Sequence, residues 1–152
     1  MQIGPYQLSN QLIVAPMAGV TDQAFRNLCL RYGAALAVSE MLSSNNDVWD
    51  SDKSRVRMAH SGEEGIRSVQ IAGADPDLMA NAAQFNVDQG AHIIDINMGC
   101  PAKKVTSGQS GSALMRTPDF ALELVEAVVQ ATSLDVTLKM RLGWDDNSLN
   151  AP

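Results

Sequence analysis

Short apolar runs alternate with longer amphipathic segments along this chain. The apolar runs predict strands at residues 12–15, 35–41, 67–72, 92–97 and 136–141. The amphipathic segments predict helices that begin near residues 21, 75 and 117. Because the strands are almost continuously apolar, we expect both faces of the sheet to be covered, as in a parallel sheet built from successive β/α units.

Each predicted helix begins with a recognisable signal. Asp22 and Asp75 are capping residues, and Pro76 and Pro118 suit the first position of a helix. The apolar positions of the first helix are expected to share one face, and these are Phe25, Leu28, Cys29 and Tyr32. These signals support helices between the strands.

Polar or reactive residues stand at the carboxyl ends of the predicted strands. They are Glu40, Gln70, Asn97, Cys100, Lys139 and Arg141. A doubly wound nucleotide-binding sheet would instead have a G-x-G-x-x-G turn after its first strand, whereas residues 15–22 are APMAGVTD. In a (β/α)8 barrel the loops that follow the strands form the catalytic face. The sequence therefore predicts an α/β fold of the TIM-barrel class, with about the first five β/α units present.

Cys100 is the most distinctive of these residues. It lies between Gly99 and Pro101, which end the strand and predict a tight turn, and Lys103 and Lys104 follow at once. A lone cysteine is more often a small buried hydrophobic residue. Its place at the mouth of a predicted barrel favours a chemical role instead.

Composition and charge narrow the possible functions. The chain has 152 residues, is 45% hydrophobic and has a formal net charge of −6, which argues mildly against a polyanionic partner. Locally basic stretches at 53–67 and 100–116 leave phosphate contacts open, with Lys103, Lys104, Arg55 and Arg57 as candidates.

Other features bear on location and metal binding. No run approaches about 18 apolar residues and no signal peptide is recognisable, so a cytoplasmic protein without a membrane segment is expected. Cys29 and Cys100 have no second ligand at metal-binding spacing, so we expect no disulfide and no metal.

Five short motifs carry a family resemblance that covers the whole chain. In order, they are APMAG at 15–19, SEM at 39–41, VQIAG at 69–73, INMGCP at 96–101 and LKMR at 138–141. Together they resemble the tRNA-dihydrouridine synthases. The segments SDKSRVRM at 51–58 and AKKV at 102–105 most resemble the bacterial B-type branch of that family.

The resemblance implies a flavin cofactor. Pro16, Met17 and Ala18 would line the isoalloxazine ring of FMN, and Gln70 and Lys139 would form hydrogen bonds with it. A lysine aimed at the ring would stabilise the negative charge of a reduced flavin, and an amide suits the mixed donors and acceptors of its edge. NADPH is the expected reductant.

The resemblance also implies how tRNA would be bound and reduced. Asn97 would bind the uracil edge, Arg141 would lie near the base or its phosphate, and Lys103 and Lys104 would contact phosphates. Cys100 would act as general acid, giving a proton to C5 while a hydride from FMN goes to C6. A free thiol has a pKa of about 8.5 and is therefore mostly protonated at neutral pH, as this role requires. The B-type resemblance points to a uridine of the D-loop.

The extent of the chain leaves alternatives open. Residues 1–152 are expected to be the N-terminal part of a flavin-binding TIM barrel, without the remaining strands and a C-terminal helical tRNA-binding domain. Such a piece would expose sheet edges, so weak FMN binding and self-association are expected. The other possibilities are an FMN barrel acting on a small molecule, such as a dihydroorotate dehydrogenase or an ene-reductase, and an inactive self-associating fragment.

Overall fold

The computed structural model describes residues 1–49 and 62–151. The strands are β1 (Gln2–Ile3), β2 (Tyr6–Gln7), β3 (Ile13–Val14), β4 (Leu36–Val38), β5 (Leu42–Ser43), β6 (Arg67–Ala72), β7 (Ile93–Met98) and β8 (Asp135–Met140). The helices are α1 (Gln23–Arg31), α3 (Pro76–Asp88), α4 (Lys103–Thr106) and α5 (Pro118–Ala131), with 3-10 turns at Asn46–Val48 and Gly111–Arg116. Arg55, Arg57 and the motif at 51–58 lie outside the described residues.

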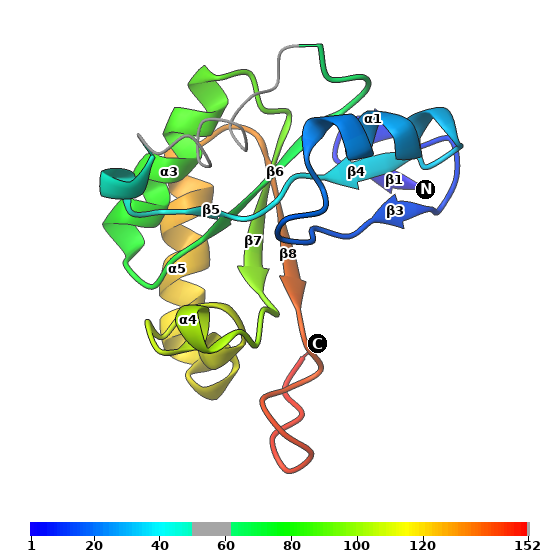
Figure 1. The fold of residues 1–152 in the computed structure, drawn as a ribbon. Coiled ribbons are helices and arrows are strands. Elements are labelled where there is room, and N and C mark those ends of the chain that lie inside the picture. The colour runs from blue at the N-terminus through cyan, green and yellow to red at the C-terminus, as the bar shows by residue number, and fades with distance from the viewer. Residues whose placement is uncertain (50–61, 152) are drawn as a thin grey trace.

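The main sheet is parallel, in the order β3-β4-β6-β7-β8, and β5 also pairs with β6. Figure 1 shows α3 and α5 side by side on one face of the sheet, where α3 contacts β6 and α5 contacts β8, and α1 over β4. The separate antiparallel hairpin β1-β2 was not expected from the sequence. The sheet and its helices form a curled half-barrel, which confirms the predicted α/β fold of the TIM-barrel class.

Strand β7 shows how one strand serves two faces. All six of its residues are buried, although Asp95 and Asn97 interrupt the apolar pattern. Ile94, Ile96 and Met98 belong to the core cluster that includes buried residues of α3 and α5. Because side chains alternate along a strand, Asp95 and Asn97 point to the opposite face.

Two strands are shorter than predicted. The strand expected at 35–41 ends at Val38, although the Ser39 backbone N–H still donates to the Ser68 carbonyl of β6 at 3.0 Å, and the chain pairs with β6 again as β5. The Ser39 hydroxyl accepts the backbone N–H of Gln70 at 3.1 Å, which is a side-chain bond to the neighbouring strand. The strand at the start of the sheet is only two residues long, Ile13–Val14.

Both predicted capping residues, Asp22 and Asp75, are confirmed. The carboxylates of Asp22 and Asp75 accept the backbone N–H groups of Phe25 and Leu78 at 2.8 and 2.9 Å. Pro76 and Pro118 begin their helices as predicted, and Thr117 makes no side-chain capping bond. These bonds satisfy donors that the first turn of a helix leaves free.

The apolar positions predicted to share one face of α1 do not form a buried face. Leu28 and Tyr32 are 51% and 86% exposed, whereas Arg26 is 1% exposed. Arg26 Nε lies 2.6 Å from Glu63 Oε1, and its Nη1 donates to the Thr21 carbonyl at 2.7 Å. A charged side chain is buried here because a carboxylate and a carbonyl compensate it.

Candidate functional site

A pocket lies at the carboxyl ends of the parallel strands. Its volume is about 220 Å³. It is lined by Pro16, Ala18, Met41, Gln70, Asn97, Gly99, Cys100, Pro101 and Lys139. The lining residues come from five separate segments of the chain, and the first and the last are 123 positions apart. They converge at the carboxyl ends of the strands, where the sequence predicted the site.

The strand register places the polar residues in two layers. Gln70 on β6 is paired with Asp95 on β7, which is paired with Thr137 on β8. One step nearer the carboxyl ends, Asn97 is paired with Lys139. Because alternate residues of a strand share a face, the first layer lies directly below the second.

A chain of hydrogen bonds joins these layers to the Cys100 turn. Thr137 Oγ1 and Gln70 Nε2 each donate to one oxygen of the Asp95 carboxylate, both at 2.6 Å. Asn97 Nδ2 donates to Gln70 Oε1 at 2.8 Å. The backbone N–H of Cys100 then donates to Asn97 Oδ1 at 3.1 Å. Buried polar side chains are thereby satisfied by one another rather than by water.

The backbone around Cys100 is held on both sides. Its carbonyl accepts the N–H of Ser112 at 3.0 Å, and the preceding Gly99 carbonyl accepts Nε of Arg141 at 2.7 Å. Gly111 has φ +62°, and a Cβ there would lie 2.6 Å from the Cys100 carbonyl oxygen. Only glycine allows this approach without a shift. The thiol therefore stands on a turn fixed by several bonds, and its side chain is partly exposed.

The loop that carries Pro16 and Ala18 is also held in place. The buried Glu40 carboxylate accepts the N–H of Gly19 at 2.7 Å. The fully buried Thr21 hydroxyl accepts the N–H of Met17 at 3.0 Å. A wall of the pocket is thus positioned by side chains that do not line it.

Asp95, in the layer below the pocket, has a displaced pKa. Burial raises the pKa of its carboxyl above the ordinary range, because the charged form loses hydration. The hydrogen bonds from Thr137 and Gln70 and the charge of Lys139 oppose this rise. Asp95 is only 5% exposed, so these neighbours, rather than water, stabilise the charged form of its carboxyl.

The structure brings most of the predicted site residues together. Pro16, Ala18, Gln70, Asn97, Cys100 and Lys139 all line the pocket. Met17 is not among the lining residues and is 40% exposed. Arg141 contacts the Gly99 carbonyl, next to the thiol, and Lys103 and Lys104 are exposed on α4 just beyond it.

Sequence reasoning missed Met41, Asp95 and Thr137 as parts of this site. Met41 lines the pocket, and the other two lie in the layer below it. The alternation of strand β7 was a usable signal for Asp95, because a residue two positions before Asn97 shares its face. No sequence signal pointed to Thr137, which lies 42 positions from Asp95.

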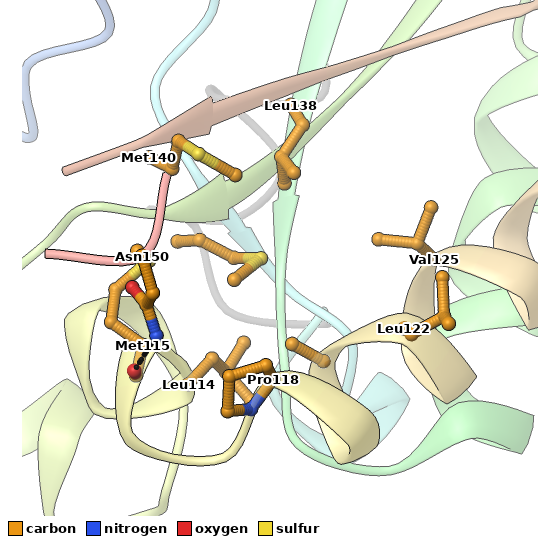
Figure 2. A pocket seen from close by; sticks show the side chains of 10 residues that line it. Leu114, Met115, Pro118, Leu122, Val125, Leu138, Met140 and Asn150 are labelled. Atoms are coloured by element: carbon orange, nitrogen blue, oxygen red, sulfur yellow. Dashed lines mark hydrogen bonds between the residues drawn. The ribbon is translucent and has the colours of Figure 1, made fainter. Parts of the chain in front are cut away.

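A second hollow lies on the other side of β7 and β8. It is lined by Met98, Leu114, Met115, Pro118, Ala121, Leu122, Val125, Leu138, Met140 and Asn150. Figure 2 shows its side chains between strand β8 and the start of α5, with the Asn150 amide donating to the Met115 carbonyl at 2.9 Å. It has no titratable side chain in its lining, so it offers no acid, base or nucleophile.

The described part of the chain, residues 1–49 and 62–151, has no group of three or more His, Cys, Asp or Glu side chains placed to hold a metal ion. None of its helices is long and apolar enough to cross a membrane.

Together, the parallel β/α sheet and a thiol among strand-end amides and a lysine define a barrel-type protein with its site at the strand ends. A sequence model of the dihydrouridine synthase (Dus) family matches residues 13–151. The chain belongs to this family.

Individual relatives agree with this assignment. The chain is 76% identical over 150 residues to tRNA-dihydrouridine synthase B of Shewanella oneidensis, covering 99% of this chain and 47% of the relative. It is 64% identical to the Vibrio vulnificus protein of the same name, with the same coverage. It is 61% identical over 144 residues to the Escherichia coli K12 protein, covering 95% of this chain and 45% of that relative. The chain thus spans about half the length of the relatives it matches.

Proposed function

We propose that this chain provides the base-reducing site of an FMN-dependent tRNA-dihydrouridine synthase that reduces a uridine of the D-loop. The observation that carries the proposal is the position of Cys100, a partly exposed thiol in one pocket with the amides of Gln70 and Asn97 and the ammonium of Lys139. Its relatives have the name tRNA-dihydrouridine synthase B. A cytoplasmic location, where tRNA is found, follows from this proposal.

The pocket residues fit a flavin ring. Pro16, Ala18 and Met41 offer apolar surface to a flat aromatic ring, while Gln70 and Lys139 offer N–H donors to its edge. When bound and reduced by NADPH, FMN supplies the hydride that goes to C6 of the uracil. Residues for the flavin phosphate, the remaining barrel strands and a helical tRNA-binding domain would come from sequence beyond these 152 residues.

The chain's own residues supply the rest of the reaction. Asn97 donates a hydrogen bond to the uracil edge and so orients the base. The Cys100 thiol gives its proton to C5, forming the C5–H bond while its S–H bond breaks, and the resulting thiolate recovers a proton from solvent. Rigid support of the Cys100 turn by Asn97, Ser112 and Arg141 keeps the thiol in place for this transfer.

Cations around the turn suit an RNA substrate. Lys103 and Lys104 are exposed on α4, directly after the Cys100 turn, where they would meet phosphates. Bases in tRNA loops are easier to unstack than bases in a duplex, so a uridine can enter a pocket of this kind at little cost.

The experiment that tests this proposal is a mass-spectrometric assay of dihydrouridine in unmodified tRNA incubated with FMN and NADPH. It compares the protein encoded by the complete reading frame with the 152-residue chain. We expect product from the former and little or none from the latter. If the former takes up FMN and oxidises NADPH but leaves tRNA unchanged, a small-molecule flavoenzyme is favoured instead. If neither protein takes up FMN and the 152-residue chain self-associates, the inactive fragment is favoured.

A further inference from the structure

The hydrogen-bond chain of the pocket can run in only one direction. Its upper end is the backbone N–H of Cys100, which can only donate, so Asn97 must turn its Oδ1 toward it. Asn97 Nδ2 then faces Gln70 Oε1, and Gln70 Nε2 faces the Asp95 carboxylate, which accepts. The donor at one end, the Cys100 N–H, and the acceptor at the other, the Asp95 carboxylate, require the same orientation of the amides of Asn97 and Gln70.

This direction limits what Asn97 can offer a ligand. Its Oδ1 already accepts two backbone N–H groups, from Gly99 at 3.3 Å and Cys100 at 3.1 Å, which occupy both lone pairs. One hydrogen of Nδ2 is bound to Gln70, and the other remains. Asn97 can therefore act toward a bound base only as a donor.

Asp95 is the buried anchor of this arrangement. It does not line the pocket, and its two oxygens are taken by Gln70 and Thr137. Without an acceptor at this position, Gln70 Nε2 would be buried at 1% exposure with an unmet donor, and the amide would be free to turn. A turn of Gln70 would present its Nε2 to Asn97 Nδ2, two donors face to face.

We propose that Asp95 is a positioning residue: it holds Gln70 with Oε1 toward Asn97 and so, together with the backbone N–H groups of Gly99 and Cys100, keeps Asn97 turned so that the pocket presents an N–H donor to the base. Such a pocket selects a base edge with a hydrogen-bond acceptor, such as a uracil carbonyl, and rejects an amino group at the same place. The choice of uracil rests on the proposed function, whereas the orientation of the amides does not.

The test uses the protein from the complete reading frame and three variants. Asp95→Ala removes the acceptor, and Asp95→Asn restores it, because the new amide oxygen can accept from Gln70 while its NH₂ group turns to the Thr137 hydroxyl. Asp77→Ala removes an exposed aspartate from the first turn of α3 and serves as control. Each is made in the parent and in an Asn97→Ala background, and kcat/KM for dihydrouridine formation is measured per folded molecule.

We expect Asp95→Ala to lower kcat/KM about tenfold in the parent, as loss of one hydrogen bond predicts. Asp95→Asn should recover most of the loss. In the Asn97→Ala background, Asp95→Ala should cost less than about twofold, because the group it positions is gone. An equal loss in both backgrounds, or no loss in the parent, would overturn the inference.

A second readout does not depend on catalysis. The Asn97 Nδ2 hydrogen bound to Gln70 should exchange slowly with solvent in the parent and in Asp95→Asn, and faster in Asp95→Ala, as seen by ¹⁵N NMR of side-chain amides. Equal exchange in all three would contradict the positioning role. If the parent makes no dihydrouridine, the proposed function fails, and the exchange data still decide whether Asp95 orients the amides.

Discussion

The two hollows beside β7 and β8 differ completely in chemistry although they share the same strands. On one side, Asn97 and Lys139 face a pocket with a thiol and amides. On the other, Met98, Leu138 and Met140 line an apolar hollow against α5 (Figure 2). Neighbouring residues thus belong to different sites, because successive side chains of a strand point to opposite faces.

The comparison teaches how a parallel sheet can carry polar chemistry without losing its core. The helix side keeps continuous apolar packing, which supplies stability. The other side tolerates a buried carboxylate and two amides because nearly every donor meets an acceptor. We therefore expect substitutions on the polar side to affect chemistry most, and those on the apolar side to affect stability most.

Cys100→Ala should give the largest effect. Loss of a general acid lowers the rate on the order of 10²–10⁴-fold, while the protein should stay folded. The rate of dihydrouridine formation, measured beside Cys29→Ala on α1, checks this. Cys29 is also a partly exposed free thiol but lies outside the pocket, so its variant should match the parent. Equal rates for both variants would remove Cys100 from the chemistry.

Leu124→Ala should give the largest effect on stability. Leu124 is 1% exposed in the core, so the cavity left by truncation should lower the free energy of unfolding by about 2–5 kcal/mol. Leu122, on the same helix, is 56% exposed, and Leu122→Ala should cost less than about 1 kcal/mol. Urea unfolding of both variants measures the difference. Similar losses for the two variants would show that Leu124 is not the more deeply packed of the two side chains.

Lys139→Gln should weaken FMN binding about tenfold, because it removes a positive charge from the lining of the pocket. Fluorescence titration with FMN measures the dissociation constant. Arg31→Gln is the control, since this exposed cation is paired with Glu64 on α1's outer surface and should leave FMN binding unchanged. An unaltered dissociation constant for Lys139→Gln would refute its role at the flavin.

The smallest expected effect is a pH dependence of stability that arises from the Asp95 carboxyl. Its folded-state pKa is raised by burial, so the native protein keeps this proton over a range where the unfolded chain has lost it. The contribution of this carboxyl to the free energy of unfolding is therefore largest below the pKa of the unfolded chain, about 3.9. It falls as the pH rises through the raised pKa of the folded protein. Asp95→Asn should flatten this fall, as measured by urea unfolding across pH. Asp77→Asn should retain it, and an unchanged slope in Asp95→Asn would contradict the assignment.

Much of this arrangement follows from local sequence signals. Strand β6 has the predicted bounds 67–72, and the carboxylates of Asp22 and Asp75 cap their helices as predicted. Gln70, Asn97 and Cys100 meet at one pocket because carboxyl ends of parallel strands lie at the same edge.

The remainder depends on contacts between distant segments. A lone aspartate in an apolar strand gives no hint of its partners, and Thr137 approaches Asp95 only through the register of β7 and β8. The periodicity of α1 could not show that Arg26 is buried, because its partner Glu63 lies 37 positions away. Tertiary packing decided both cases.

The most direct test of the division between the two sides uses adjacent residues, Asn97 and Met98. Asn97→Ala and Met98→Ala are compared for the urea midpoint and for dihydrouridine turnover per folded molecule. We predict that Asn97→Ala lowers turnover at least about tenfold, whereas Met98→Ala lowers the urea midpoint and leaves turnover within about twofold of the parent. If Met98→Ala lowers turnover per folded molecule as much as Asn97→Ala does, the two faces of β7 do not have separate roles.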